Sequence, residues 1–364
     1  MKKPFTVHGG DLDWAEKTFG IPKSEILDFS GNVNPLGFPE KAKKLLAENI
    51  DLVSVYPDKN YEKLRESMGE YTGAKVEHIT VGNGSTELIS SYIKCVNAEK
   101  AVILGPAYSE YERELKITGS SYEYYPLREE DGFKINVDGL IDFLKPGIGL
   151  FIACNPNNPT GTAISSDQMR RILAHCRSLG IHVMIDETYI EFSENLDKIT
   201  SIPLVEEFDN LFVIRGISKF FAAPGIRLGY GICSSEKFFE ELKEKKDPWS
   251  VNILAAFAGE NIFRDKEFIA RTKKLVSEEK KKAYAELSTW KNIKYYETQS
   301  NFVLLKLLTD KITSGEIFHA LIKKKMFVRD ASTFTFLDDT FLRFSFLKPE
   351  DNENFLRELK KLVE

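Results

Sequence analysis

Short apolar runs alternate with longer segments of helical periodicity through the first two thirds of the chain. The apolar runs are rich in strand-forming residues and occur at residues 79–81, 101–104, 150–154, 182–185 and 211–214. Between them, segments such as residues 87–96 and 167–179 have the spacing of helices. Strands without a polar face belong to sheets that helices cover on both sides. The pattern therefore predicts an α/β fold with a mostly parallel sheet.

The pattern changes near residue 234. Long charged segments predict helices at residues 236–246 and 265–287, and strand candidates follow at residues 302–305 and 341–346. This texture is typical of a smaller α+β domain. The first residues lack the alternation, so we expect them to pack with the C-terminal part. The expected division is a large α/β domain at residues 50–245 and a small, discontinuous domain made of residues 1–49 and 246–364.

Composition narrows the class of protein. A chain of 364 residues is long enough for about two domains, and 42% hydrophobic with 29% charged residues excludes a disordered or fibrous protein. The formal net charge of -5 argues against a nucleic-acid partner. No apolar run approaches the roughly 20 residues that cross a bilayer, and no signal-peptide pattern opens the chain. We therefore expect a cytoplasmic protein with no membrane partner.

The four cysteines, Cys95, Cys154, Cys176 and Cys233, lie far apart and form no C-x-x-C pair. Most of them stand inside apolar segments, which favours free buried thiols in a reducing compartment. No metal site is expected.

Residues that can bind a ligand follow four of the predicted strands. Residues 82–87 follow the first, residues 155–161 follow the third, Asp186 ends the fourth, and the fifth runs into Ser218 and Lys219. In open α/β sheets, ligands bind beyond the carboxyl ends of the strands. We expect these loops to meet at one crevice.

Each motif alone is ambiguous. Gly84, Ser85 and Thr86 open a predicted helix and could hold an anion at its N-terminus, or form an ordinary turn and cap. Glu87 stands where a dinucleotide-binding fingerprint requires glycine. Asp186 could equally be a helix cap.

Four motifs in order carry a resemblance that the single motifs do not. They are Asn158-Pro159-Thr160-Gly161, Asp186-Glu187-Thr188-Tyr189, Ser218-Lys219 and Gly225-Ile226-Arg227-Leu228-Gly229. In this order and spacing, the chain resembles the pyridoxal 5'-phosphate enzymes of fold type I, the aspartate aminotransferase superfamily. The resemblance extends over essentially the whole chain. It implies pyridoxal 5'-phosphate as cofactor and a homodimer whose active site lies near the subunit boundary.

The resemblance also implies roles for individual residues. Lys219 is expected to bind the cofactor aldehyde covalently and then to move a proton at the substrate carbon. Asp186 is expected to pair with the pyridine nitrogen, and Tyr108 to stack on the ring as the third catalytic residue. Asn158 and Tyr189 are expected to hydrogen-bond the ring hydroxyl.

The remaining cofactor contacts concern the phosphate. By resemblance they are Gly84, Ser85, Thr86, Ser218 and Arg227, together with Tyr56, which is expected to reach the phosphate site of the partner subunit. A packing tyrosine at a turn is the alternative for Tyr56. Where many relatives carry a hydroxyl residue two positions before Ser218, this chain has Gly216. We therefore expect somewhat weaker cofactor retention.

Two branches of the superfamily share these motifs: the threonine-phosphate decarboxylases of cobalamin biosynthesis and the histidinol-phosphate aminotransferases. His8-Gly9-Gly10 and the segments at residues 28–37 and 248–252 resemble the decarboxylases. By resemblance, His8, Asn32, Arg329 and Arg343 bind the substrate. A tail position for His8 and surface ion pairs for the arginines are the alternatives.

The expected reaction is decarboxylation of L-threonine O-3-phosphate to (R)-1-amino-2-propanol O-2-phosphate. If the two arginines capture the phosphate, the carboxylate can stand perpendicular to the cofactor ring, where its bond to carbon breaks. The alternatives are histidinol-phosphate transamination with 2-oxoglutarate and glutamate, and a non-catalytic binding protein that keeps the fold. Phosphothreonine and phosphoserine differ by one methyl group, and none of the predicted site residues distinguishes between them.

Overall fold

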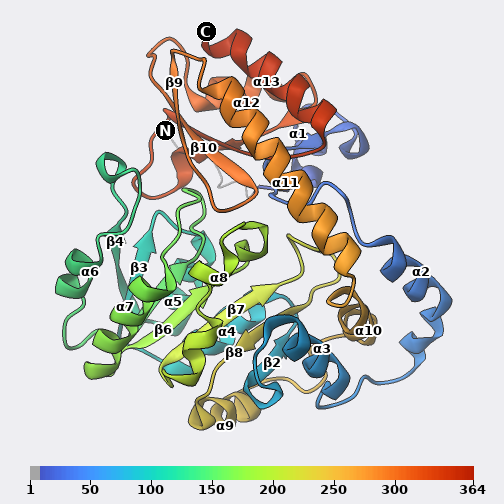
Figure 1. The fold of residues 1–364 in the computed structure, drawn as a ribbon, viewed down its shortest axis with the longest axis vertical. Helices are drawn as coiled ribbons and strands as arrows, with labels where there is room; N and C mark the ends of the chain where they lie inside the picture. Colours follow the sequence, from blue (N-terminus) through green and yellow to red (C-terminus); the bar gives the residue numbers. More distant parts are fainter. Residues whose placement is uncertain (1–8) are drawn as a thin grey trace.

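The computed structural model describes residues 9–364, with the side chain of Lys243 left out. His8 lies outside the described residues. Within this range the strands form a large sheet, a small sheet and a short two-stranded pair. Figure 1 shows the large sheet and its helices below the small sheet, with α11 (Lys266–Leu287) running from one part towards the other.

Seven strands between residues 9 and 364 make the large sheet, in the order β2-β8-β7-β6-β5-β3-β4. Their bounds are β2 Ile79–Gly82, β3 Lys100–Gly105, β4 Ser121–Pro126, β5 Leu150–Cys154, β6 His182–Asp186, β7 Leu211–Gly216 and β8 Gly229–Ile232. Neighbours from β4 to β7 pair in parallel, whereas β8 is antiparallel to both β7 and β2. The predicted mostly parallel sheet and all five predicted strands are confirmed, and β4 and β8 are additions.

Helices cover this sheet. They are α4 Ser85–Val96, α5 Ser109–Thr118, α6 Val137–Phe143, α7 Ser166–Ser178, α8 Leu196–Ile199 and α9 Glu236–Lys245. The predicted helices at residues 87–96 and 167–179 correspond to α4 and α7. Every residue of β5 and β7 is buried, as a sheet covered on both faces requires.

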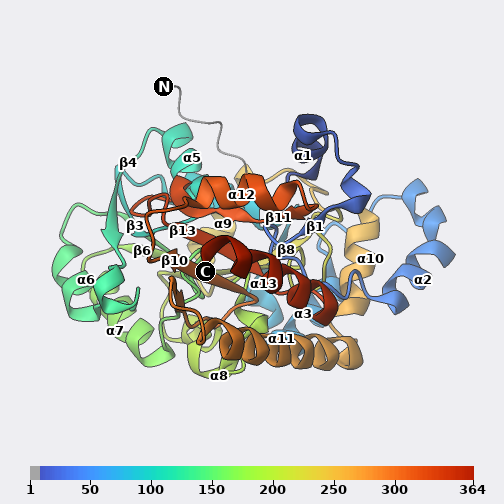
Figure 2. The same cartoon turned by 90° about the horizontal axis from the view of Figure 1, so that it is seen from above.

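The small sheet is antiparallel, with the order β12-β13-β10-β9. Its strands are β9 Ile293–Tyr296, β10 Phe302–Leu307, β12 Arg329–Asp330 and β13 Phe341–Ser345. Helices α11, α12 Ser314–Ile322 and α13 Pro349–Val363 pack beside one another over it (Figure 2). The strands expected at residues 302–305 and 341–346 are therefore confirmed, and they pair with Leu304 opposite Arg343.

Segments from the two ends of the chain lie together. Strand β1 (Leu27–Asp28) pairs in parallel with β11 (Met326–Phe327), and Ala15 of α1 (Leu12–Phe19) packs in a hydrophobic cluster with Ile322 and Phe327. In another region, α2 (Glu40–Glu48) and α3 (Glu62–Thr72) both contact α10 (Ile253–Ile262). The domain boundaries at residues 50 and 245 stay a prediction.

Two further findings concern the cysteines and possible membrane-spanning helices. All four cysteines are free and buried, as expected. Among residues 9–364, no helix has both the length and the apolar character that a membrane span needs.

Candidate active site

One cleft of about 250 Å³ lies at the carboxyl ends of the large-sheet strands. It is bounded by the loops that follow these strands and by residues of the small sheet. It brings together most of the residues predicted from the sequence: Asn32, Ser85, Thr86, Tyr108, Asn158, Asp186, Tyr189, Ser218, Lys219, Arg227, Arg329 and Arg343. The expected convergence of the loops is therefore found. Gly84 and Tyr56 do not line the cleft, and His8 lies outside the described residues.

Lys219 follows β7 and reaches into the cleft. Its Nζ donates a hydrogen bond to the carbonyl of Gly31, at 2.7 Å. Burial, together with the nearby positive charge of Arg343, lowers the pKa of Lys219 to about 8. An amine in this range can both release and take up a proton near neutral pH, as a proton carrier must.

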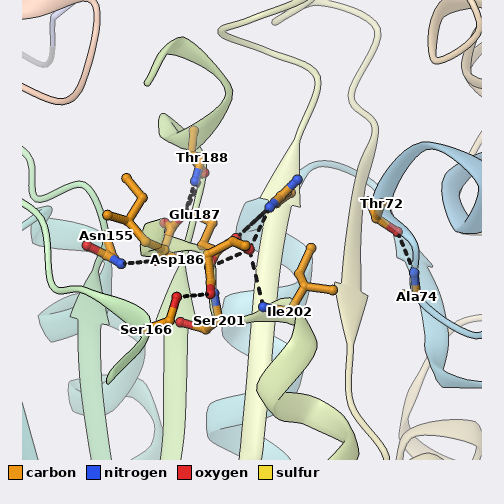
Figure 3. Close-up of polar contacts among 12 residues, drawn as sticks. Thr72, Ala74, Asn155, Ser166, Asp186, Glu187, Thr188, Ser201 and Ile202 are labelled. Carbon is orange, nitrogen blue, oxygen red and sulfur yellow. Dashed lines mark hydrogen bonds and ion pairs between the residues drawn. The ribbon is translucent and has the colours of Figure 1, made fainter. Parts of the chain in front are cut away.

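Asp186 ends β6 and is 5% exposed. The Tyr111 hydroxyl donates to its Oδ2 at 2.7 Å. The backbone N–H and the hydroxyl of Thr188 donate to Oδ1 at 2.9 and 2.5 Å (Figure 3). Burial raises the pKa of Asp186, and these donors oppose that rise. The carboxylate is thus held in one orientation at the cleft. The helix cap considered as the alternative for Asp186 is not found, because the next helical turn begins at Ile190 with Tyr189 at its N-cap. The pairing of Asp186 with the cofactor ring nitrogen stays a prediction.

Tyr111 was not predicted. It stands three residues after Tyr108, in the first turns of α5, and its ring meets that of Tyr108 edge to face at 5.8 Å. Residues three apart on a helix are neighbours. That spacing is the signal by which Tyr111 could have been found.

A buried ion pair joins the end of β6, where Asp186 lies, to β7, the strand that precedes Lys219. Glu187 Oε2 accepts from Arg215 Nη2 at 2.8 Å, and Glu187 Oε1 accepts from the backbone N–H of Ser201 at 2.5 Å (Figure 3). Side-chain exposure is 0% for Glu187 and 4% for Arg215. Breaking such a pair costs about 3 to 5 kcal/mol because it leaves a buried charge without a partner. The pair therefore holds the ends of β6 and β7 together.

The N-terminus of α4 forms an anion cradle. Ser85 and Thr86 begin the helix, and Ser218 and Arg227 face the same cleft. Gly84 caps the helix with φ of +80°, and a Cβ there would overlap the Arg227 guanidinium. Only glycine leaves room for this approach. Backbone N–H groups at a helix start, with hydroxyls and an arginine, suit a phosphate dianion.

Gly216 stands beside this cradle at the end of β7. A Cβ there would lie 3.6 Å from Ser85 Cβ. The space next to Ser85 is thus compatible with a side chain that this sequence lacks. Weaker cofactor retention stays a prediction.

The two arginines predicted to bind substrate, Arg343 and Arg329, have different contacts. Arg343 is 4% exposed, and its guanidinium donates to Asn158 Oδ1 and to the Ser30 carbonyl. Burial lowers the pKa of Arg343 to about 10. A surface ion pair is thus the wrong interpretation for this residue. Arg329 Nη2 donates to Thr333 Oγ1 at 2.7 Å and its guanidinium lies over the Phe334 ring at 5.1 Å.

The start of the described chain enters the same cleft. Gly9 lines it, and a Cβ there would overlap the Ser30 carbonyl and lie 3.4 Å from Arg343 Nη2. The backbone N–H of Gly10 donates to Ser30 Oγ at 2.8 Å. Gly9 of the His8-Gly9-Gly10 motif is therefore placed next to an arginine expected to bind substrate, and Gly10 is bonded to Ser30 beside it.

Tyr108, Asn32 and Tyr189 complete the walls. Burial raises the pKa of Tyr108 to about 12 and that of Tyr189 above its usual value. Asn32 Nδ2 donates to the Tyr189 hydroxyl at 3.5 Å. Both phenols therefore stay protonated across the ordinary pH range.

Tyr56 lies on the surface outside the cleft. It is 80% exposed, and its ring contacts that of Trp249 at 5.0 Å. Trp249, in the segment at residues 248–252, is itself 42% exposed and therefore is not a core residue of the subunit.

A lysine amine, a buried carboxylate and a phosphate cradle now face one cleft of an α/β fold. This donor set fits the aldehyde, the ring nitrogen and the phosphate of pyridoxal 5'-phosphate, and it defines an enzyme of fold type I. The chain belongs to the aminotransferase class I and II family, whose model matches residues 24–359. Pyridoxal 5'-phosphate is the cofactor of this family, so the cofactor expected from the sequence is confirmed.

Three similar proteins span nearly the whole chain. A protein of Caldanaerobacter subterraneus subsp. tengcongensis, provisionally named threonine-phosphate decarboxylase, is 40% identical over 92% of this chain and 89% of its own. The threonine-phosphate decarboxylase of Salmonella typhimurium is 30% identical over 98% and 97%. The crystal structure of the histidinol-phosphate aminotransferase from Clostridium acetobutylicum is 32% identical, with a TM-score of 0.85 over 92% and 98%.

Proposed function

We propose that the protein decarboxylates L-threonine O-3-phosphate to (R)-1-amino-2-propanol O-2-phosphate, as a step in cobalamin biosynthesis. The observation that carries this proposal is the position of Gly9 in the cleft, beside Arg343. The His8-Gly9-Gly10 motif is the sequence feature that most resembles the decarboxylases. Near-full-length similarity to proteins that bear the decarboxylase name supports the same choice.

In this proposal the residues that line the cleft have separate tasks. Arg329 and Arg343 bind the substrate phosphate, which leaves the carboxylate free to stand perpendicular to the cofactor ring. When bound, the cofactor withdraws the electron pair of the bond that releases carbon dioxide. Lys219 Nζ then donates a proton to the carbon that has lost the carboxylate. The buried walls and Gly9 exclude water from that carbon.

Phosphothreonine is expected to release one carbon dioxide per turnover with no keto acid present. Unphosphorylated threonine lacks the charged anchor, and its kcat/KM should be lower by at least about tenfold, because a hydrogen bond to a charged group contributes about 1.5 to 3 kcal/mol. Carbon dioxide release and product phosphate ester would be measured on the holoenzyme. Equal kcat/KM for the two substrates would contradict phosphate anchoring.

Histidinol-phosphate transamination is the second candidate, favoured by the close structural match to the Clostridium acetobutylicum enzyme. The two reactions can be distinguished by their need for a keto acid and by the release of carbon dioxide. Consumption of histidinol phosphate only with 2-oxoglutarate, with no carbon dioxide from phosphothreonine, would establish the aminotransferase. A protein with no visible cofactor absorbance after addition of pyridoxal 5'-phosphate would instead support a non-catalytic role.

His8 is proposed to act on the substrate and not on the cofactor. It directly precedes Gly9, which lines the cleft. In that role it would orient the anionic end of the substrate and help to exclude water.

We further propose a cytoplasmic homodimer. Several apolar side chains are exposed around Tyr56: Ile50, Val53 and Val55 are 53%, 59% and 57% exposed. Water-exposed apolar groups so close in sequence are typical of an interface. A second copy of the chain covering this surface would bring Tyr56 near a partner's cleft.

Mixed dimers are expected to show that two subunits share each site. In a dimer of one Tyr56→Phe subunit and one Lys219→Ala subunit, one site would carry both defects and the other neither. Such a dimer should therefore retain about half of the wild-type activity, measured after affinity purification through two different tags. Activity no higher than that of one Tyr56→Phe site would argue that Tyr56 acts within its own subunit.

A further inference from the structure

The loop that follows β1 contacts three parts of the site at once. The Gly31 carbonyl accepts from Lys219 Nζ at 2.7 Å. The Ser30 carbonyl accepts from Arg343, and Ser30 Oγ accepts from the backbone N–H of Gly10 at 2.8 Å. Lys219, Arg343 and Gly10 therefore all form hydrogen bonds with Ser30 or Gly31.

One carboxylate fixes the shape of this loop. Asp28 Oδ1 accepts from the backbone N–H of Ser30 at 2.8 Å, from Ser30 Oγ at 2.6 Å and from the backbone N–H of Gly31 at 3.1 Å. A Cβ at Gly31 would lie only 2.5 Å from Asp28 Oδ2. Side-chain bonds of aspartate to the backbone two and three residues ahead are a strong local constraint.

Asp28 also contributes a negative charge near Lys219. Burial and Arg343 lower the pKa of Lys219, Asp28 raises it, Arg227 lowers it and Asp186 raises it. Asp28 and Asp186 are thus the carboxylates that favour the charged amine, against two arginines. In the proposed function, Asp186 pairs with the cofactor ring nitrogen. Asp28 is then the carboxylate whose charge offsets the arginines on the substrate side of Lys219.

We propose that Asp28 is a positioning residue with two separable effects on the reaction. Its charge and its bond to the Gly31 amide set the state and the resting place of the Lys219 amine. Its bond to Ser30 Oγ orients the hydroxyl that holds Gly10, and so keeps Gly9 over the substrate. The second effect rests on the proposed function, whereas the first does not depend on which substrate the enzyme takes.

Asp28→Asn tests the charge, because asparagine keeps an Oδ1 that can accept the same bonds. The apoprotein would be labelled with an amine-reactive reagent over a pH series, and modification of Lys219 quantified by mass spectrometry. Loss of the negative charge should move the labelling midpoint to lower pH by about 0.5 to 1 unit. In the holoenzyme, kcat should change together with its pH profile, and the KM for phosphothreonine should change by less than about twofold.

Ser30→Ala tests the hydroxyl and leaves the charge in place. Without the bond to Gly10, the KM for phosphothreonine should rise by about threefold to tenfold. The labelling midpoint of Lys219 should stay at the wild-type value. A residue with only a structural role would shift both readouts in both variants, or neither.

Asp167→Asn is the matched control for the loss of one negative charge, because Asp167 has a 98% exposed side chain on α7. It should match the wild type in both readouts. The proposal fails if Asp28→Asn leaves the midpoint unchanged, or if Ser30→Ala shifts it as far as Asp28→Asn does. If Asp28→Asn yields no folded protein by circular dichroism, Asp28→Glu replaces it and should keep the wild-type midpoint. If the enzyme does not use phosphothreonine, the labelling result still decides the role of Asp28.

Discussion

Replacing Lys219 with alanine should reduce the turnover of phosphothreonine by at least about 10⁴-fold and leave the fold intact. The substitution removes the amine that anchors the cofactor covalently and that moves the proton at the substrate carbon. It should not open the core, since the amine points into the cleft towards the Gly31 carbonyl. Carbon dioxide release and circular dichroism would be measured on the same preparation. Turnover near the wild-type rate would remove the central claim of the proposed mechanism.

Lys280 provides a matched control for that experiment. It is also a buried lysine, and burial lowers its pKa to about 8 as well. Its Nζ donates to the Thr298 carbonyl at 3.2 Å, and it does not line the cleft. Lys280→Met should keep kcat within about threefold of wild type, because a shifted pKa matters to the reaction only where the amine faces the substrate.

The strands of the large sheet that the sequence predicted are those with a continuous apolar run. The two strands of this sheet that it missed, β4 and β8, lack one for different physical reasons. The residues of β4 are polar or tyrosine at most positions and only partly buried, because β4 forms an edge of the sheet. Strand β8 alternates glycine with larger residues, since a Cβ at Gly229 would lie 2.6 Å from the Ser85 nitrogen. Such close approach depends on tertiary packing, which no local pattern encodes.

The site shows the same division between local and long-range information. Lys219 and Asp186 could be predicted because each directly follows a strand and the parallel topology brings strand ends together. Their supports could not be predicted in this way. Glu187 directly follows β6 and Arg215 lies on β7, and Arg215 follows an apolar run that by itself predicts only burial. Asp28 lies about 190 residues before Lys219, and the Gly31 carbonyl that links them carries no side-chain signal.

Replacing Asp186 with alanine should lower kcat by about 10² to 10³-fold, the range typical of losing one fixed electrostatic group in a water-excluded site. Cofactor affinity should fall much less, by about tenfold, because the phosphate cradle at Ser85, Thr86 and Arg227 remains. Titration with pyridoxal 5'-phosphate would give the affinity, and saturating cofactor would isolate the effect on kcat.

Tyr111→Phe gives a graded comparison with Asp186→Ala, because it removes one donor from the carboxylate and keeps the charge. The Tyr111 hydroxyl donates to Asp186 Oδ2 at 2.7 Å, whereas the Thr188 donors occupy Oδ1. Its loss should lower kcat by only about threefold to tenfold, the effect of one hydrogen bond. If Asp186 acted only as a cap for Thr188, Asp186→Ala would change stability and leave kcat at saturating cofactor unchanged. A large loss of kcat in Asp186→Ala, with a small one in Tyr111→Phe, is the result that an electrostatic role requires.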